Sequence, residues 1–254
     1  MTYETFPLTA ENDFLPDLDA IPEETARRAK FIYINYPNNP TGAVATKAFY
    51  EKLVAWAKTY EVGVVSDLAY GALGYQGYEN PSFLSTPGAK DVGIEFYTFS
   101  KTFNMAGWRL AFAAGNDQMI EALNLIQDHL FVGIFPALQE AGIAALLDTK
   151  SEEAVAQLNA TYDRRRDAFV QAAAKIGWQA FPSRGSFYAW MPVPEGYTSE
   201  SFADLLLEKA HVAVAPGKGF GPAGDAYVRI GLLVEPERLV EAVNRIANLH
   251  LFNN

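Results

Sequence analysis

Short apolar runs alternate along this chain with turn formers and with helix-patterned stretches. Runs at 31–36, 62–67, 94–99 and 109–114 predict strands. The first has the uninterrupted apolar character of a strand buried on both faces of a sheet. It ends at 37–42, where prolines and a glycine stop regular structure.

Helical spacing separates and follows these runs. Thr46 is suited to cap a helix that carries Phe49, Leu53 and Trp56 on one side and ends near Tyr60. The stretch 100–108 has neither pattern, so we expect a loop there. Further helices are expected at 117–131, 136–148, within 151–177, at 199–209 and at 235–249, and short strands at 186–191, 211–215 and 226–233.

The order of these elements predicts an α/β fold. Strands and helices alternate in the first part, which indicates a mostly parallel sheet with helices on both faces. The second part is smaller and of α+β type. We place the boundary near residue 150, so that 1–150 form the larger domain and 151–254 a smaller one that begins with the long helix.

Composition excludes several classes of partner. The 254 residues include 20 Lys and Arg against 30 Asp and Glu, a net charge of −10, which argues against nucleic acid and anionic membranes as partners. There is no Cys, and the 3 His show no metal-ligand spacing. The N-terminus lacks the apolar segment of a secretion signal, and no apolar run approaches the ~18 residues of a membrane span. We therefore expect a cytoplasmic protein.

Polar side chains follow the apolar runs at the carboxyl ends of the expected strands, where open parallel sheets bind ligands. They are Asn39, Asp67 with Tyr70, and Lys101. A lysine amine can condense with an aldehyde, and a carboxylate can keep a pyridine nitrogen protonated. A phenol and an amide can bind a ring hydroxyl. The set suits an aromatic aldehyde cofactor with a ring nitrogen.

Two arginines extend the candidate site. Arg109 follows Lys101 by eight residues, close enough for its guanidinium to neutralise a phosphate. The hydroxyls of Thr98 and Ser100 can donate hydrogen bonds to the same phosphate. Arg229 lies in an expected strand of the second part, where it can bind a substrate carboxylate through two parallel hydrogen bonds.

Taken one at a time, these residues also have structural interpretations. The 39–42 segment suits a plain turn, Asp67 suits a cap, and Lys101 suits a solvated loop. Arginines in strands often form ion pairs. The segments 184–188 and 217–221 carry a weaker expectation, a place near the substrate.

In joint order, these motifs resemble those of the class I and II aminotransferases of pyridoxal phosphate fold type I. The spacing matches that family over nearly the whole chain: 28 residues from Asn39 to Asp67, 34 to Lys101, 8 to Arg109 and 120 to Arg229. The segment 36–43 makes the chain similar to bacterial members of the LL-diaminopimelate and methionine types.

The resemblance implies a role for each position. Lys101 would form the internal aldimine with pyridoxal 5′-phosphate and then move the substrate proton, and Asp67 would pair with the ring nitrogen. The remaining cofactor contacts would be those to the ring hydroxyl, from Asn39 and Tyr70, and those to the phosphate, from Thr98, Ser100 and Arg109. The substrate carboxylate would be bound by Arg229 and Asn39.

The implied reaction is transamination between an amino acid and a 2-oxo acid, in an enzyme that is usually a homodimer. A β-lyase on the same scaffold, or a module that binds or regulates without turnover, are alternatives. Family members carry many residues before the matching segment, so the chain resembles their carboxyl-terminal two-thirds. A sheet without its first strands exposes edges and apolar faces, so we expect poor solubility or a need for a complementing N-terminal segment.

Overall fold

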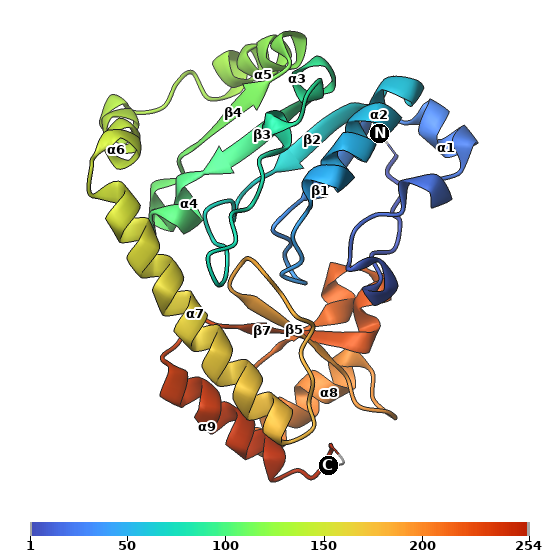
Figure 1. Cartoon of the computed structure of the whole chain (residues 1–254), viewed down its shortest axis with the longest axis vertical. Helices are drawn as coiled ribbons and strands as arrows, with labels where there is room; N and C mark the ends of the chain where they lie inside the picture. The colour runs from blue at the N-terminus through green and yellow to red at the C-terminus, as the bar shows by residue number, and fades with distance from the viewer. Residues whose placement is uncertain (1, 253–254) are drawn as a thin grey trace.

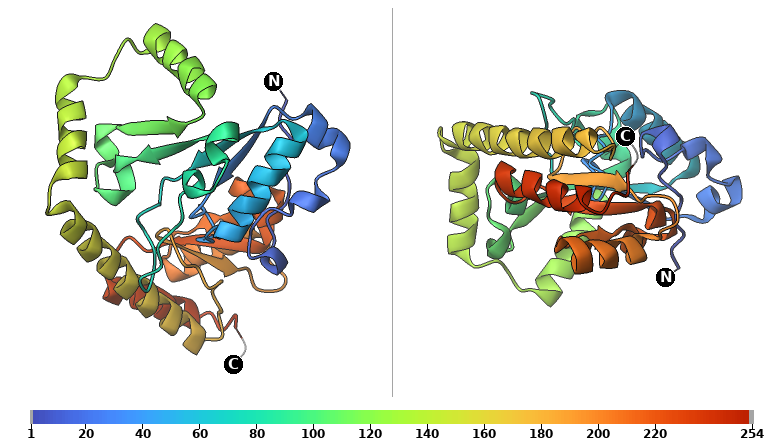
Figure 2. Two further views of the ribbon diagram at one scale, coloured as in Figure 1. Left: turned by 45° about the horizontal axis from the view of Figure 1, so that its top comes forward. Right: turned by 90° about the horizontal axis from the view of Figure 1, so that it is seen from below.

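The structure is a computed structural model that describes residues 2–252 (Figure 1). Within these residues one sheet is built from the segment 31–115 and a smaller one from 188–231. A long helix, α7 (Ser151–Lys175), runs along one side of the molecule from the first sheet to the second, as Figures 1 and 2 show. The expected α/β class is confirmed.

The first sheet supplies the carboxyl-terminal edge at which the candidate residues lie. Its strand order is β1 (Phe31–Asn35), β2 (Gly63–Asp67), β3 (Gly93–Thr98) and β4 (Ala111–Gly115). The first three strands are parallel, and β4 is antiparallel to β3. The expected strands are confirmed, with small shifts at their ends.

The prediction that the first strand is buried on both faces is wrong. Ile32 and Ile34 are buried, whereas Phe31 is 55% and Tyr33 is 63% exposed. Because successive side chains point to opposite faces of a strand, one face of β1 is covered and the other is open. Helical cover is therefore found on one side of β1 only. An unbroken apolar run does not reveal this difference, since aromatic residues suit both a core and an open sheet face.

The helices largely follow the expected pattern. They are α1 (Glu23–Arg28), α2 (Lys47–Tyr60), α3 (Ala89–Val92), α4 (Phe99–Thr102), α5 (Asp117–Leu130), α6 (Pro136–Leu147), α7, α8 (Ser199–Leu205) and α9 (Pro236–Ala247). Thr46 caps α2 as predicted, accepting a hydrogen bond from the Phe49 N–H at 3.1 Å. Leu53 of α2 packs in one core with Ile32 and Ile34, so α2 covers the buried face of β1.

The segment 100–108, expected to be a loop, is partly helical. Helix α4 continues directly from β3, and a 3₁₀ turn follows at Ala106–Trp108. The hydroxyl of Thr98 accepts a hydrogen bond from the Ser100 N–H at 3.2 Å and so caps α4. Single turns of this kind have no apolar periodicity, which is why the sequence pattern did not predict them.

The second sheet has the strand order β5 (Tyr188–Pro192), β7 (Tyr227–Gly231), β6 (Ala215–Pro216), with all neighbours antiparallel. Helix α8 continues into a π-helical turn at Leu206–Ala210. Helices α7 and α9 lie side by side (Figures 1 and 2). The domain boundary near residue 150 stays a prediction, since Tyr162 of α7 packs with residues of the first part and Phe169 with the core of the second.

Exposed apolar side chains mark α5 and α6. Leu125, Leu130, Phe131, Phe135 and Leu147 are each at least 60% exposed. Together with the open face of β1, they form apolar surface of the kind that favours association or aggregation. The expected poor solubility of the isolated chain stays a prediction; a monodisperse monomer on size exclusion would contradict it.

A buried carboxylate joins β3 to its neighbours, and its removal should destabilise the fold. Glu95 is 5% exposed and accepts hydrogen bonds from the Ser66 hydroxyl at 3.0 Å, the Phe83 N–H at 2.8 Å and the Ser82 hydroxyl. Glu95→Ala would leave buried donors without an acceptor. We expect it to lower the free energy of unfolding by about 3 kcal/mol in urea denaturation.

The control for this variant is Glu79→Ala, which removes an exposed carboxylate close by in the chain. It should change the free energy of unfolding by less than about 0.5 kcal/mol. Equal stability losses in the two variants would show that the hydrogen bonds of Glu95 do not stabilise the sheet.

Candidate functional site

Parallel pairing brings the ends of β1, β2 and β3 to one edge of the first sheet. Asn35, Asp67 and Phe96 occupy matching positions on the three strands. Asn39 lies just beyond β1, and Lys101 lies in α4, directly after β3. This edge of the sheet therefore carries the amide of Asn39, the carboxylate of Asp67 and the amine of Lys101.

The turn after β1 is held by a network of amide hydrogen bonds. Asn35 donates from Nδ2 to the Asp67 carbonyl at 2.9 Å, and its Oδ1 accepts from the Asn39 N–H at 3.0 Å. The Asn38 side chain accepts hydrogen bonds from the backbone N–H and the hydroxyl of Thr41. The turn interpretation of 39–42 is thus confirmed, and the turn fixes Asn39 relative to Asp67.

The carboxylate of Asp67 has a donor on each oxygen. Oδ1 accepts from the Ala69 N–H at 3.1 Å, so Asp67 does cap the following segment. Oδ2 accepts from the hydroxyl of Tyr33 at 3.0 Å. Asp67 is half-buried, so both contacts orient a carboxylate that stays accessible to a ligand.

Tyr70 is the buried centre of the arrangement. Its ring lies 5.2 Å from that of Phe187 and 6.1 Å from that of Tyr188. Burial, followed by the neighbouring Tyr188 phenol, raises the pKa of the Tyr70 phenol well above its ordinary value, while Arg229 opposes this shift. The phenol is therefore a neutral donor at neutral pH.

Lys101 faces aromatic rings rather than a carboxylate. Its Nζ lies 6.0 Å from the centroid of the Tyr70 ring and 5.4 Å from that of Phe187. Within residues 2–252 the amine makes no salt bridge. An amine without an ionic partner next to buried aromatic groups is suited to act as a nucleophile.

Of the three residues expected to bind a phosphate, Thr98 and Ser100 lie at the start of α4, and Arg109 lies seven residues beyond its end, next to Leu110. The Thr98 hydroxyl is 2.9 Å from that of Ser100, and it contacts the Leu110 carbonyl at 3.3 Å. Arg109 was expected to begin a strand, which is wrong. It is exposed, with φ +53°, and donates to the Ala106 carbonyl at 3.0 Å, and β4 begins at Ala111.

Arg229 crosses from the second sheet to the turn after β1. Its Nη1 donates to Asn39 Oδ1 at 2.8 Å. The guanidinium lies 4.2 Å from the centroid of the Tyr188 ring and 4.7 Å from that of Phe220. These contacts place a planar cation, held between two rings, at the edge that carries Asn39. The segments 184–188 and 217–221 thus do reach the candidate site, through Phe187, Tyr188 and Phe220.

Two contributors were not singled out from the sequence, namely Tyr33 and Asn35. Both are on β1, on the side that faces the Asp67 carboxylate and carbonyl. Residues two apart on a strand share a face, so the spacing of Tyr33 and Asn35 could have indicated that both polar groups lie on one side of β1. The sequence pattern was instead interpreted as one apolar run.

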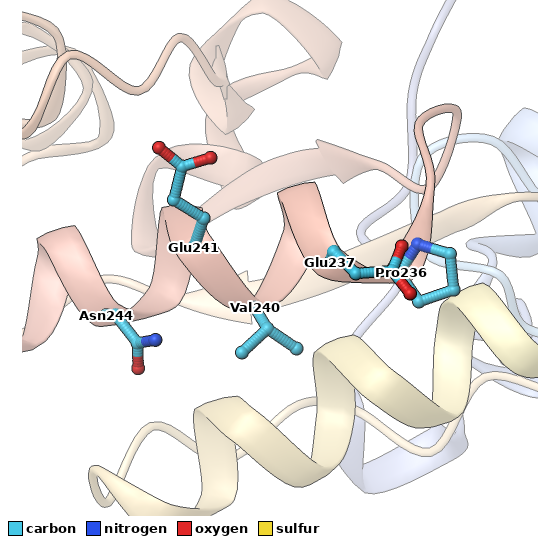
Figure 3. A pocket seen from close by; sticks show the side chains of 5 residues that line it. All are labelled: Pro236, Glu237, Val240, Glu241 and Asn244. Carbon is cyan, nitrogen blue, oxygen red and sulfur yellow. The ribbon is translucent and has the colours of Figure 1, made fainter.

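The pocket drawn in Figure 3 lies apart from this site. Its lining comes from α9 alone: Pro236, Glu237, Val240, Glu241 and Asn244. Glu241 already pairs with Arg238 and Arg245. The described residues include no cluster of metal-ligand type and no helix long and apolar enough to cross a membrane. The cytoplasmic location stays a prediction.

This edge of the sheet brings together four reactive or binding groups: the Lys101 amine, the Asp67 carboxylate, the Tyr70 phenol and the Arg229 guanidinium. An amine can bind a carbonyl carbon, and the guanidinium can bind a carboxylate through parallel hydrogen bonds. Such a set suits chemistry on a small molecule that carries both groups.

Comparison with known sequences identifies the family of this chain. The family model for aminotransferase class I and II matches residues 1–246. The L-glutamine–4-(methylsulfanyl)-2-oxobutanoate aminotransferase of Bacillus subtilis is 56% identical over 249 residues, which are 98% of this chain and 62% of that protein. The LL-diaminopimelate aminotransferase of Moorella thermoacetica is 50% identical over 240 residues, 94% of this chain and 61% of that protein. The chain thus spans less than two-thirds of the length of these relatives.

Solved structures give the same result. Apo-BacF from Bacillus subtilis superposes with a TM-score of 0.92 at 46% identity, and the match covers 98% of this chain and 63% of the BacF chain. An aminotransferase from Staphylococcus aureus also reaches 0.92, at 39% identity, over 98% of this chain and 66% of its own. The resemblance in the motifs is confirmed over the whole described fold, and the chain belongs to the class I and II aminotransferase family.

Proposed function

We propose that this chain carries out pyridoxal 5′-phosphate-dependent transamination between an amino acid and a 2-oxo acid, with Lys101 as the residue that binds the cofactor aldehyde. One observation carries the proposal. The Lys101 amine lies 6.0 Å from the centroid of the Tyr70 ring, which lies 6.1 Å from the Tyr188 ring, and the Arg229 guanidinium lies 4.2 Å from that same Tyr188 ring. An amine for the cofactor aldehyde and a guanidinium for a substrate carboxylate therefore lie around one pair of tyrosine rings.

The chemistry of the side chains present fits this cofactor. The amine of Lys101 faces aromatic rings and has no salt bridge within residues 2–252, so no carboxylate there competes for it. Asp67 offers an oriented carboxylate to a protonated ring nitrogen. A phosphate would be bound by the residues around α4, namely Thr98, Ser100 and Arg109.

When bound, pyridoxal phosphate supplies an electron-withdrawing ring that stabilises negative charge at the substrate Cα. The chain's own residues do the rest. Lys101 removes and returns the proton at Cα as a general base and acid. Tyr70 and Asn39 bind the ring hydroxyl. Arg229, oriented by Asn39 at 2.8 Å, binds the substrate α-carboxylate and fixes which bond at Cα faces the base.

For the substrate, we propose an amino acid of the group on which the relatives act. Their names specify L-glutamine with 4-(methylsulfanyl)-2-oxobutanoate, and LL-diaminopimelate. Arg229 would bind the α-carboxylate that these molecules share. Elimination at Cβ and binding without turnover are less favoured, because the relatives named here are aminotransferases.

We further propose that the active form is a homodimer, or a complex of this chain with a complementing N-terminal segment. Exposed apolar residues on α5 and α6 support an association of this kind. Sedimentation at several concentrations would measure it.

The proposal is tested by reductive trapping. The chain is incubated with pyridoxal phosphate, reduced with borohydride and digested, and peptide mass spectrometry locates the pyridoxyl group. We expect one adduct, on Lys101, that is lost in Lys101→Arg and retained in Lys47→Arg, which changes an exposed lysine of α2. Adducts spread over surface lysines, or no adduct on Lys101, would contradict the assignment.

A further inference from the structure

Tyr33 makes the least expected contact at the site. Its hydroxyl donates to Asp67 Oδ2 at 3.0 Å, although its ring lies on the open face of β1 and is 63% exposed. In the strand register Tyr33 is opposite Val65, so its side chain reaches diagonally along the sheet to Asp67. An apolar residue at this position would leave Oδ2 without this donor.

The rest of the Asp67 environment fixes the carboxylate from other directions. Oδ1 accepts from the Ala69 N–H at 3.1 Å, and Asn35 Nδ2 donates to the Asp67 carbonyl at 2.9 Å. Each carboxylate oxygen has two acceptor positions, so a further acceptor position remains on both oxygens. The carboxylate is therefore held in one rotation and can still receive a hydrogen bond from a ligand.

We propose that Tyr33 is a positioning residue that orients the ionised carboxylate of Asp67 toward the ring nitrogen of the cofactor, an inference that rests on the proposed function. A hydrogen bond donated to a carboxylate oxygen is shorter and stronger than one between neutral groups, so it restricts the rotation of the carboxylate. Tyr33 thus acts through Asp67 and touches neither substrate nor phosphate.

The phenol of Tyr33 keeps its proton over the whole working range. Partial burial, then the charge and hydrogen bond of Asp67, raise the pKa of the Tyr33 phenol to about 12. Below that pH the hydroxyl is a constant donor. Because the ring is largely exposed, Tyr33→Phe removes this donor without opening a cavity in the core.

The first test measures the contact in the chain without cofactor. Urea unfolding of the wild type, Tyr33→Phe, Asp67→Ala and the double variant gives a double-mutant cycle. We expect the two substitutions to be coupled by roughly 3- to 10-fold in the unfolding equilibrium constant. Tyr60→Phe, which changes a tyrosine of α2 away from the site, should show no coupling to Asp67→Ala. Additive effects in the Tyr33 cycle would overturn the inference.

The second test asks whether the contact serves the ring nitrogen. Dissociation constants are measured by absorbance for pyridoxal phosphate and for its analogue with carbon in place of the ring nitrogen. Tyr33→Phe should raise the constant for pyridoxal phosphate roughly 3- to 10-fold and leave that of the analogue unchanged, and Tyr60→Phe should change neither. Equal weakening for both ligands would indicate a merely structural role and overturn the inference.

The two proposals fail in different ways. If the wild type binds pyridoxal phosphate on Lys101 but Tyr33→Phe binds it equally well, the role of Tyr33 is wrong and the proposed function stands. If the wild type binds no pyridoxal phosphate, the proposed function is wrong and the inference that rests on it falls as well.

Discussion

Replacing Lys101 with alanine is expected to abolish transamination while the chain remains folded. Among residues 2–252, Lys101 is the amine that lies at this edge, and in the proposed function it binds the cofactor aldehyde and also moves the substrate proton. Loss of proton transfer alone lowers turnover by on the order of 10⁴-fold, and loss of the covalent step adds to it. Lys101 is half-buried and has no salt bridge within residues 2–252, so its removal should cost little stability.

The measurement is the formation of 2-oxo acid from an amino acid, with and without an acceptor 2-oxo acid, alongside circular dichroism. Lys47→Ala serves as the matched control and should keep full activity. Wild-type activity in Lys101→Ala would remove this residue from its assigned role. If more than one equivalent of oxo acid per chain formed without an acceptor, the reaction would instead be elimination at Cβ.

The second large effect is expected for Arg229→Lys. This substitution keeps the positive charge but loses the planar fork that binds a carboxylate with two hydrogen bonds. It also loses the stacking on Tyr188 at 4.2 Å and the contact with Asn39 at 2.8 Å. We expect kcat/KM for the amino acid to fall on the order of 10²-fold, mainly through a higher KM.

Reductive trapping separates this substrate effect from an effect on the cofactor. Arg229→Lys should still give the pyridoxyl adduct on Lys101, because Arg229 is assigned to the substrate and not to the cofactor aldehyde. Arg238→Lys is the control, since Arg238 is exposed and pairs with Glu241 on α9. An unchanged KM in Arg229→Lys would show that the carboxylate binds elsewhere.

Local signals predicted much of the fold. Thr46 identified the start of α2, because a hydroxyl that caps a helix acts within one turn of it. The strand ends at Asp67 and near Asn39 were identified in the same way, from charged and turn-forming residues after apolar runs. Helix α4 was missed, since a single turn has too few residues to show a period.

The candidate site divides in a similar way. The order of Asn39, Asp67 and Lys101 at the ends of parallel strands is a consequence of topology, so a sequence pattern could predict it. The contact between Tyr33 and Asp67 depends on the register of β1 against β2, which the sequence pattern left open. The left-handed backbone of Arg109 depends on the turn that leads into β4.

Caps, turn formers and alternation act over a few neighbouring residues, so the order of amino acids was enough to predict the succession of elements and the residue types at their ends. The open face of β1 and the phenol that reaches Asp67 depend instead on how distant segments pack. The same holds for the contact between Arg229 and Asn39, which are 190 residues apart in the chain. Contacts of that range depend on how two sheets and α7 pack together, and packing is a property of the whole folded chain.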